Sequence, residues 1–308
     1  MTQNFIEVPH INGYLLVAPD IYVEPRATPF FRVPEMRKGS QPTDNGNLLL
    51  TPEERDELIT KNPRAEKWIR PFVGSREFIR KIERYCLWLV DCPPDELRKM
   101  PLVYQRVKAV REFRLSSKKA ATRQSADRPT QFQEIRQPTR DYILVPRHSS
   151  ELRRYVPIGY VSSNVICGDA NHMIPNAELF HFGVLTSSVH MTWMRTVCGR
   201  LTSRYRYSAT IVYNCFPWPL YYPESFKPRV EATARKILDV RAKYPTASFA
   251  DLYDEISMPA DLRRAHAEND AAVMSLYPFR PDTPEEILQV RLLEMYEMLR
   301  QDFADAED

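Results

Sequence analysis

The sequence has little glycine and lacks the common loops that bind nucleotides or zinc. Only 8 of its 308 residues are glycine, and no two of them form a G-x-G pair. It contains neither the G-x-x-x-x-G-K-S/T loop that cradles phosphates nor the H-E-x-x-H motif of zinc hydrolases. These absences argue against a nucleotide-driven enzyme and against a zinc hydrolase of that type.

Cysteine, histidine and long apolar runs are also scarce. The five cysteines have no C-x-x-C spacing, which predicts free, mostly buried thiols in a reducing compartment and no zinc site. The histidines are isolated, and His190 stands among apolar residues, which favours a packed or hydrogen-bonded side chain over a metal ligand. No apolar run approaches the roughly 20 residues of a membrane span, and no signal peptide is visible at the first residues. We therefore expect a cytoplasmic protein with no membrane partner.

Charge is distributed unevenly along an otherwise ordinary globular composition. Hydrophobic residues make up 43% and charged residues 27%, and the net charge is only +3. The stretch 106–154 is nevertheless strongly basic, whereas the end of the chain after Pro281 is acidic. The basic residues of the 106–154 stretch include Arg106, Lys108, Arg111, Arg114, Lys118, Lys119, Arg123 and Arg128. Such one-signed charge favours contact with phosphates over a merely solvated helix face.

The pattern of residues predicts an α+β chain that ends in helices. Thr51-Pro52-Glu53-Glu54 predicts a helix to Lys61, and a long basic helix is expected over 104–121. Strands are expected at 14–17, 21–23, 84–90, 141–146, 155–161, 165–167 and 211–213. Further helices are expected at 94–100, 192–201, 230–241, 249–255, 259–277 and from 283 onward. Together these elements indicate a mixed, largely antiparallel sheet followed by a small all-α region.

The segment Phe182–Pro219 concentrates arginine, tyrosine and hydroxyl side chains. Arg204 and Arg206 alternate with Tyr205 and Tyr207, and the segment closes on an aromatic–proline run. The planar guanidinium fork of arginine pairs with guanine edges or with phosphates. On residues alone, a nucleic-acid-reading surface and a surface strand pair with solvated arginines both remain open.

The order of residues across several blocks resembles the MmeI-like (type IIL) DNA adenine methyltransferases and restriction-modification enzymes. The resemblance is carried by His190–Leu201 (HMTWMRTVCGRL), Ser203–Ser208, Asn214–Pro219, Ile69–Ile79, Arg84–Asp91 and Asn47–Glu54. It covers nearly the whole chain, and it corresponds to the C-terminal part of such proteins. By this resemblance, residues 1–66 connect to a preceding methyltransferase domain, 67–221 form the target-recognition domain, and 222–308 form the C-terminal helical domain.

The resemblance also implies which residues meet double-stranded DNA. Base choice falls on the first and third positions of the x-S-x-Y-R-Y-S segment, here Thr202 and Arg204, with Arg206 next in alternation. Alternate residues of a strand point the same way, so these three are expected to face one groove. Spacing adds Asp169 and Ala170 as base-recognition candidates. Contacts to the DNA backbone are expected from Arg200 and Ser203 in this segment. The charge of the basic stretch adds Lys118, Lys119, Arg114 and Arg123.

The family's methyl-transfer chemistry needs elements that this sequence lacks. A glycine-rich loop for S-adenosylmethionine and an Asn-Pro-Pro-aromatic loop for the flipped adenine are both missing. The nearest stretch, Asp91-Cys92-Pro93-Pro94-Asp95, has no aromatic residue and is expected to be a strand end turning into a helix. No cofactor is therefore expected in this chain, which is predicted to be inactive alone and to work with a methyltransferase domain or subunit. The alternative is an inactive remnant that binds other proteins through its helical domain.

Overall fold

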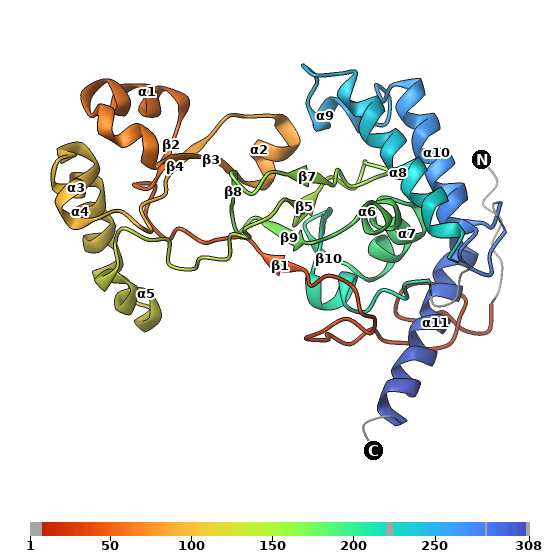
Figure 1. Ribbon diagram of the computed structural model, residues 1–308. Coiled ribbons are helices and arrows are strands. Elements are labelled where there is room, and N and C mark those ends of the chain that lie inside the picture. Colours follow the sequence, from red (N-terminus) through yellow and green to blue (C-terminus); the bar gives the residue numbers. More distant parts are fainter. Residues whose placement is uncertain (1–7, 220–223, 281, 306–308) are drawn as a thin grey trace.

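The computed structural model describes residues 8–219, 224–280 and 282–305. Figure 1 shows two lobes of unequal size, joined by a narrow waist of strands and extended chain. Antiparallel sheets combine with many helices, and the end of the chain is helical, which confirms the predicted α+β class. Within the described ranges, no helix has the length and apolar character needed to cross a membrane.

The smaller lobe holds a short sheet covered by helices. Its elements are β2 (Leu49–Leu50), α1 (Pro52–Lys61), a 3-10 helix (Pro63–Trp68), β4 (Tyr85–Leu87), α3 (Pro94–Arg98), α4 (Pro101–Leu115), α5 (Ala120–Gln124) and a second 3-10 helix (Ser125–Asp127). α1 begins where the sequence predicts. Thr51 and Glu54 form a capping box in which each side chain accepts the other's backbone N–H, at 3.2 and 2.9 Å.

The waist is built where strands from distant parts of the chain pair. β3 (Ile69–Val73) pairs antiparallel with β4 and parallel with β8 (Ile166–Cys167), which gives the sheet order β2-β4-β3-β8. A β-carbon at Gly39 would overlap the backbone of Gly168, so glycine allows the two chain segments to approach this closely. Helix α2 (Ser75–Arg80) follows β3 directly.

The larger lobe contains two sheets and the remaining helices. One sheet has the order β1-β9-β5-β7, and the other has the order β10-β11-β6. The strands are β1 (Arg37–Lys38), β5 (Tyr142–Pro146), β6 (His148–Ser149), β7 (Gly159–Val161), β9 (Asn171–Pro175), β10 (Gly199–Leu201) and β11 (Arg204–Arg206). The helices are α6 (Leu179–Leu185), α7 (Ser188–Val197), α8 (Phe226–Ala242), α9 (Phe249–Leu252), α10 (Ala260–Met274) and α11 (Glu285–Asp305).

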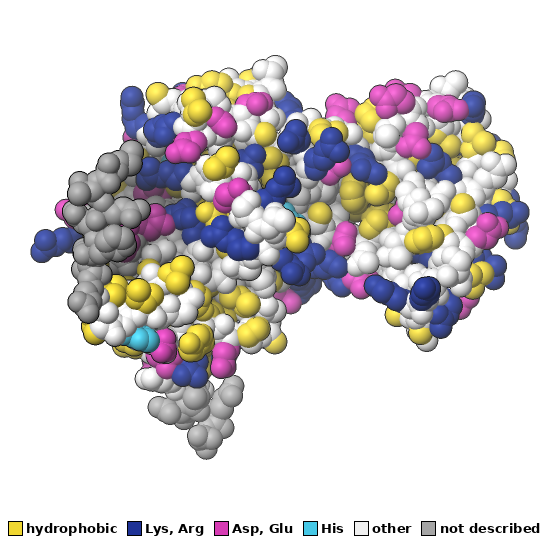
Figure 2. Space-filling view, turned by 180° about the vertical axis from the view of Figure 1, so that it is seen from behind, with side chains coloured by type: hydrophobic (Ala, Val, Ile, Leu, Met, Phe, Trp, Pro, Cys, Tyr) yellow, Lys and Arg dark blue, Asp and Glu magenta, His cyan; other side chains and the backbone are white. Residues whose placement is uncertain are grey.

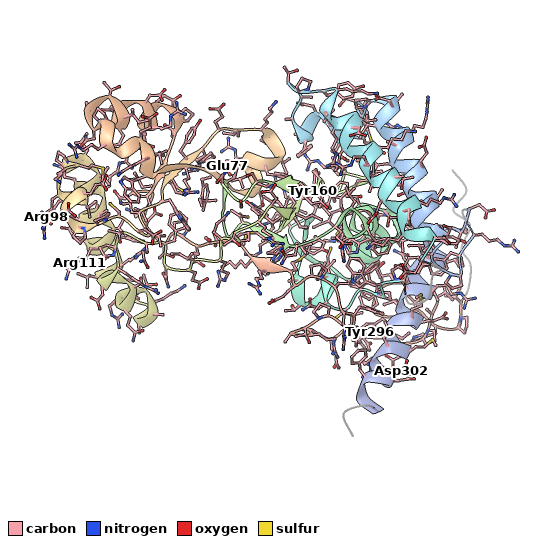
Figure 3. All side chains as sticks on the ribbon, viewed as in Figure 1. Glu77, Arg98, Arg111, Tyr160, Tyr296 and Asp302 are labelled. Carbon is pink, nitrogen blue, oxygen red and sulfur yellow. The ribbon has the colours of Figure 1, made fainter. Side chains whose placement is uncertain are left out.

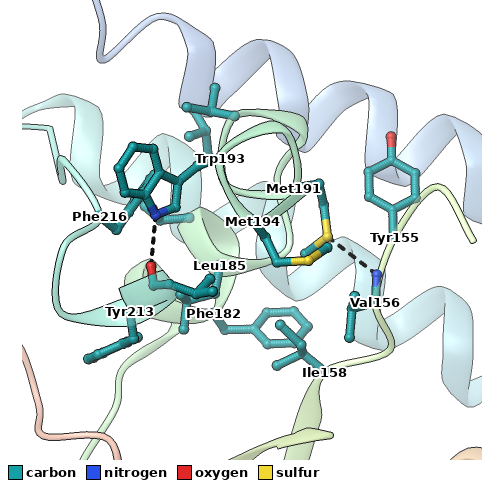
Figure 4. Packing of buried hydrophobic residues seen from close by; sticks show 14 of the residues in the cluster. Tyr155, Val156, Ile158, Phe182, Leu185, Met191, Trp193, Met194, Tyr213 and Phe216 are labelled. Carbon is teal, nitrogen blue, oxygen red and sulfur yellow. Dashed lines mark hydrogen bonds between the residues drawn. The ribbon is translucent and has the colours of Figure 1, made fainter. Parts of the chain in front are cut away.

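The core of the larger lobe joins segments from most of the chain. Trp193 is fully buried, and its indole N–H donates to the Val212 carbonyl at 2.9 Å (Figure 4). The same apolar cluster contains Phe30 near the N-terminus, Ile143 on β5 and Leu292 on α11. The helices after residue 224 thus pack on the sheet region through a continuous core. The division at 66/67 and 221/222 stays a prediction.

Several expected elements were wrong in whole or in part, and tertiary contacts explain why. The helix expected over 192–201 ends at Val197, because Gly199–Leu201 pair with β11 as strand β10. Residues 14–17 and 21–23 form no strands, because this segment lies along the surface of the larger lobe without a strand partner. Residues 211–213 belong to a π-helical turn, Ala209–Tyr213, whose carbonyls accept hydrogen bonds from Trp193 and from the backbone N–H of Arg26. The basic helix expected over 104–121 ends at Leu115, and α5 follows only after a break.

Candidate nucleic-acid interface

Two antiparallel strands form an arginine hairpin (residues 199–206) on the surface of the larger lobe. β10 pairs with β11, and β11 pairs on its other side with β6, so that Arg206 lies opposite His148. Along β11 the residues alternate: Tyr205 is buried, whereas Arg204 and Arg206 are exposed. The tyrosines thus hold the strand to the core and leave the two guanidinium groups free to meet a partner, as the sequence predicts.

Thr202 does not share a strand face with the two arginines, which corrects the expectation from alternation. Leu201 pairs with Arg204, so Thr202 and Ser203 form the two-residue turn of the hairpin. Thr202 has a φ of 56°, a left-handed conformation that β-branched residues rarely adopt. Its side chain is exposed at the tip of the hairpin, and its hydroxyl donates to the Leu201 carbonyl.

Arg200 is exposed but partly engaged within the hairpin. Its guanidinium lies over the Tyr205 ring, 4.4 Å from the ring centroid, and donates to the Ser203 carbonyl at 3.1 Å. Arg204 and Arg206, by contrast, have no side-chain hydrogen bond or ion pair within the described residues. Arg200 therefore stiffens the hairpin, whereas Arg204 and Arg206 have all their donors available.

Asp169 and Ala170 lie in the turn between β8 and β9, and the structure brings them to the arginine hairpin. Arg147 makes the connection: its backbone N–H donates to the Ala170 carbonyl at 3.1 Å, and its Nη1 donates to the Asp169 carbonyl at 3.0 Å. The carbonyl of Arg147 in turn accepts the Tyr207 N–H at 2.8 Å. The Asp169 carboxylate lies 3.5 Å from the ammonium of Lys38.

Two buried histidines fix Tyr207, the residue that follows β11. His190 Nε2 lies 2.8 Å from the Tyr207 hydroxyl, and His172 Nε2 lies 3.2 Å from the Tyr207 carbonyl. Burial lowers the pKa of His172 to about 4 and that of His190 to about 3, so both rings are neutral at pH 7. His190 is a hydrogen-bonded core residue, as expected, and it holds the end of the arginine strand in place.

The basic residues of the middle of the chain do not join the arginine hairpin. Lys118 and Lys119 are exposed between α4 and α5, and Arg123 donates to the carbonyls of Ser117 and Lys118 at 2.8 and 2.9 Å. Figure 1 shows these helices in the smaller lobe and β10 in the larger one. The predicted backbone contacts therefore fall on two separate surfaces.

Arg114 cannot be a phosphate contact, which corrects another expectation. It is fully buried, and its five N–H groups donate to five backbone carbonyls between 2.7 and 3.1 Å away. The carbonyls belong to Pro42, Thr43, Ser125, Arg128 and Gln131. Arg114 thus ties the chain around the end of α4 and has no donor left for DNA.

Comparison with known proteins identifies the family. The family model described as the MmeI target recognition domain matches residues 17–220, and that of the MmeI C-terminal domain matches residues 223–304. This chain belongs to the MmeI family. The arginine hairpin and the Asp169–Ala170 turn both lie within its target recognition domain.

Two relatives show how much of an MmeI-family protein this chain represents. DNA methyltransferase A of Bacillus subtilis (strain 168) is 35% identical over 291 residues, which cover 94% of this chain and 33% of that protein. The solved structure of the type IIL restriction-modification enzyme MmeI in complex with DNA is 46% identical, with a TM-score of 0.93. That match covers 96% of this chain and 39% of the MmeI chain. The chain thus spans well under half the length of the relatives it matches.

Sequence reasoning missed several arginines of the MmeI-family fold that surround the hairpin. Arg147, Arg153, Arg76 and Arg80 lie near Arg204 or the 169–170 turn, although they come from separate parts of the chain. Arg76 falls in one of the blocks that carry the family resemblance, but nothing in its local pattern marks it as part of an interface. Among the described residues, no group of three or more His, Cys, Asp or Glu side chains is placed to hold a metal ion.

Proposed function

We propose that this chain is the sequence-specific double-stranded DNA recognition module of an adenine-N6 DNA methyltransferase. The observation that carries the proposal is the exposed, unpartnered pair Arg204 and Arg206 on a strand that buried tyrosines and histidines hold rigidly. Membership of the MmeI family supports it, as does the likeness to a structure solved with DNA.

Arg204 and Arg206 are the base-reading side chains in this proposal. An arginine that bonds both acceptors of a guanine contributes roughly 1–3 kcal/mol of discrimination against the wrong base pair. Thr202 at the hairpin tip and the Asp169–Ala170 turn contribute to the same site, because Arg147 connects that turn to the hairpin. Arg200 and Ser203 hold the DNA backbone, and Lys118, Lys119 and Arg123 add phosphate contacts on the smaller lobe.

The methyl-transfer reaction belongs to a catalytic domain outside this chain. S-adenosylmethionine would be bound by that domain, since the chain has no glycine-rich loop and the proline pair Pro93-Pro94 only begins α3. This module would place duplex DNA so that one adenine can leave the base stack. Because the ligand in this proposal is double-stranded DNA, we also propose that the protein acts in the cytoplasm.

Selection from a randomised duplex pool, followed by sequencing of the bound fraction, tests the proposal. We expect an enriched motif of a few base pairs for the wild-type chain, and loss of one or more positions of that motif in Arg204→Ala and Arg206→Ala. Arg98→Ala is the matched control, because Arg98 is an exposed helical arginine in the smaller lobe (Figure 3). Binding without any motif would contradict a recognition role and favour the protein-interaction alternative.

A methylation assay tests whether methyl transfer requires a separate methyltransferase domain. We expect no methyl transfer from S-adenosylmethionine to DNA by the purified 308-residue chain. We expect transfer to the selected motif when a methyltransferase domain of the family is supplied. Methyl transfer by the chain alone would show that the catalytic site had been assigned to the wrong part of the protein.

A further inference from the structure

An open groove lies beside the arginine hairpin and is lined by four arginines. We call it the arginine groove. Its arginines are Arg76 and Arg80 from α2, Arg153 from the chain after β6, and Arg204 from β11, and His148 also lines it. Its volume is about 570 Å³, and no carboxylate of the described residues lines it. Figure 2 shows lysine and arginine side chains concentrated at the waist between the two lobes.

The four guanidinium groups of the arginine groove have no partners within the described residues. None of them makes an ion pair or a side-chain hydrogen bond, and the Nε of Arg153 is shielded from solvent without an acceptor. Two nearby acids have hydrogen-bonding partners outside the groove: the Glu77 carboxylate faces Arg84 at 3.4 Å, and that of Asp254 accepts two backbone N–H groups. The groove therefore gathers donors without acceptors and an excess of positive charge, which the nearby carboxylates of Asp254 and Glu151 offset only in part.

The positive field is visible in neighbouring titratable groups. Burial lowers the pKa of Arg153, and the charges of Arg80 and Arg204 act in the same direction, while the charge of Asp254 opposes them. Burial likewise lowers the pKa of His148, with the charges of Arg147, Arg206 and Arg204 adding to the effect. An anion with several oxygen acceptors would relieve this repulsion and satisfy the guanidinium forks, as a phosphate does.

Packing holds the helix that carries Arg76 and Arg80 firmly against the rest of the site. The Ser75 hydroxyl contacts the Ala170 carbonyl and the Asn171 side chain, which places α2 against the 169–170 turn. On its other side, the ring of Phe78 packs on that of Phe249 of α9, with ring centroids 5.0 Å apart. The groove is thus preformed, because α2 is anchored both to the recognition region and to the C-terminal helices.

We propose that Arg76, Arg80 and Arg153 form a clamp for DNA phosphates beside the bases that Arg204 and Arg206 read. This inference rests on the proposed function, and it adds the residues that fix the register of the duplex. Arg204 lines both the groove and the exposed face of the hairpin, so an anion in the groove is adjacent to the reading strand. Phosphate contacts position a duplex and carry no sequence information directly.

Equilibrium binding of labelled duplexes, one with the selected motif and one scrambled, tests the clamp. We expect Arg76→Ala and Arg80→Ala each to weaken binding to both duplexes by the same factor, about tenfold, which is typical of removing one charged hydrogen bond. Between about 50 and 200 mM salt, the slope of log K against log salt should become shallower by about 0.9 for each phosphate that the variant no longer neutralises. The selected motif should not change, and Arg98→Ala should bind as the wild type does.

A neutral methylphosphonate placed at single backbone positions identifies the contacted phosphate. At the position of the contacted phosphate, the methylphosphonate should weaken binding by the wild type but not by the Arg76→Ala/Arg80→Ala variant. Arg80→Lys should retain part of the charge-dependent affinity. Circular dichroism confirms that each variant is folded, since Arg76 and Arg80 are exposed.

The possible failures are distinguishable. If the wild type selects a motif but the double variant keeps wild-type affinity and salt slope, the clamp is wrong and the recognition function stands. If the wild type binds no duplex in a salt-dependent manner, the proposed function itself is wrong. Binding of pyrophosphate that depends on these arginines, with duplex affinity unaffected by their replacement, would identify a small-anion site and overturn the DNA assignment.

Discussion

Replacing Arg114 with alanine should strongly destabilise the smaller lobe, although the residue belongs to the most basic stretch of the sequence. The side chain is fully buried and makes five hydrogen bonds to backbone carbonyls. Burial lowers the pKa of Arg114, while the nearby charge of Asp44 opposes that shift. The guanidinium remains charged, because arginine keeps its proton in proteins even when it is buried.

The magnitude follows from what each carbonyl loses. The carbonyls of Pro42, Ser125 and Arg128 also accept a backbone N–H, at 3.4, 3.2 and 3.2 Å, and so keep one partner without Arg114. Within the described residues, Thr43 and Gln131 have Arg114 as the one partner of their carbonyls. Leaving a buried acceptor unsatisfied costs roughly 1–3 kcal/mol, so two of them predict a loss of about 4 kcal/mol.

Arg111→Ala is the matched control for this experiment. Arg111 lies on the same helix, three residues earlier, and is exposed in the smaller lobe (Figure 3). Its replacement should change the free energy of unfolding by no more than about 0.5 kcal/mol. Arg114→Lys should fall between the two, because an ammonium offers three donors from a single point.

Urea unfolding measures the destabilisation, and hydrogen exchange locates it. In Arg114→Ala, amides in 42–50 and 101–135 should exchange faster, while those in 226–274 should keep their wild-type protection. The reasoning is refuted if Arg114→Ala and Arg111→Ala unfold at the same urea concentration. It is also refuted if the decrease in protection lies in the C-terminal helices.

Three further predictions concern the larger lobe. The free energy of unfolding should rise with pH from about 4 to 6.5, by up to about 1.4 kcal/mol per pH unit for each buried histidine. The reason is that unfolding restores the ordinary pKa of His172 and His190, so the unfolded chain binds protons that the folded chain does not. An unchanged pH slope in His190→Phe would contradict this. Gly183→Ala should lower the free energy of unfolding by about 1–3 kcal/mol, since the added β-carbon would lie 2.7 Å from a valine of α8. The control is Gly199→Ala, whose β-carbon meets no atom within 4 Å and should leave thermal unfolding unchanged. Asp270→Ala should lower the free energy of unfolding in urea by about 2–4 kcal/mol. The Asp270 carboxylate accepts a tyrosine hydroxyl and the first backbone N–H of α7, at 2.6 and 2.7 Å. A loss below about 1 kcal/mol, the size of one ordinary hydrogen bond, would show that Asp270 does not hold these two groups together.

Local signals in the sequence were sufficient for much of the secondary structure. Thr51 and Glu54 define the start of α1, and Ser248 with Asp251 defines that of α9, because a capping box needs only side chains three residues apart. The alternation of arginine and tyrosine over 204–207 likewise predicted which side chains are buried and which are exposed. These features depend on neighbours along the chain, so the sequence alone contains them.

One signal in the sequence indicated that Arg114 is buried, but the positive charge of the surrounding stretch favoured the opposite prediction. Val103, Val107, Val110 and Arg114 follow helical spacing, so the arginine continues the apolar face of α4. Its carbonyl acceptors, however, come from 42–43 and 125–131, and no local pattern indicates that these segments meet. The turn at Ala209–Tyr213 was misjudged for the same reason, because its carbonyls are taken by Trp193 and Arg26 from elsewhere in the chain.

The sequence by itself determined the family, the α+β class and the exposed arginines of β11. These depend on residue order, local periodicity and the alternation of a strand, all of which operate over a few residues. Only the tertiary structure decided that Thr202 lies in a turn, that Arg114 is buried, and that Arg76, Arg80 and Arg153 line one groove with Arg204. The physical reason is that burial and charge clustering depend on which distant segments pack together, and that packing is set by the whole core rather than by neighbours in the chain.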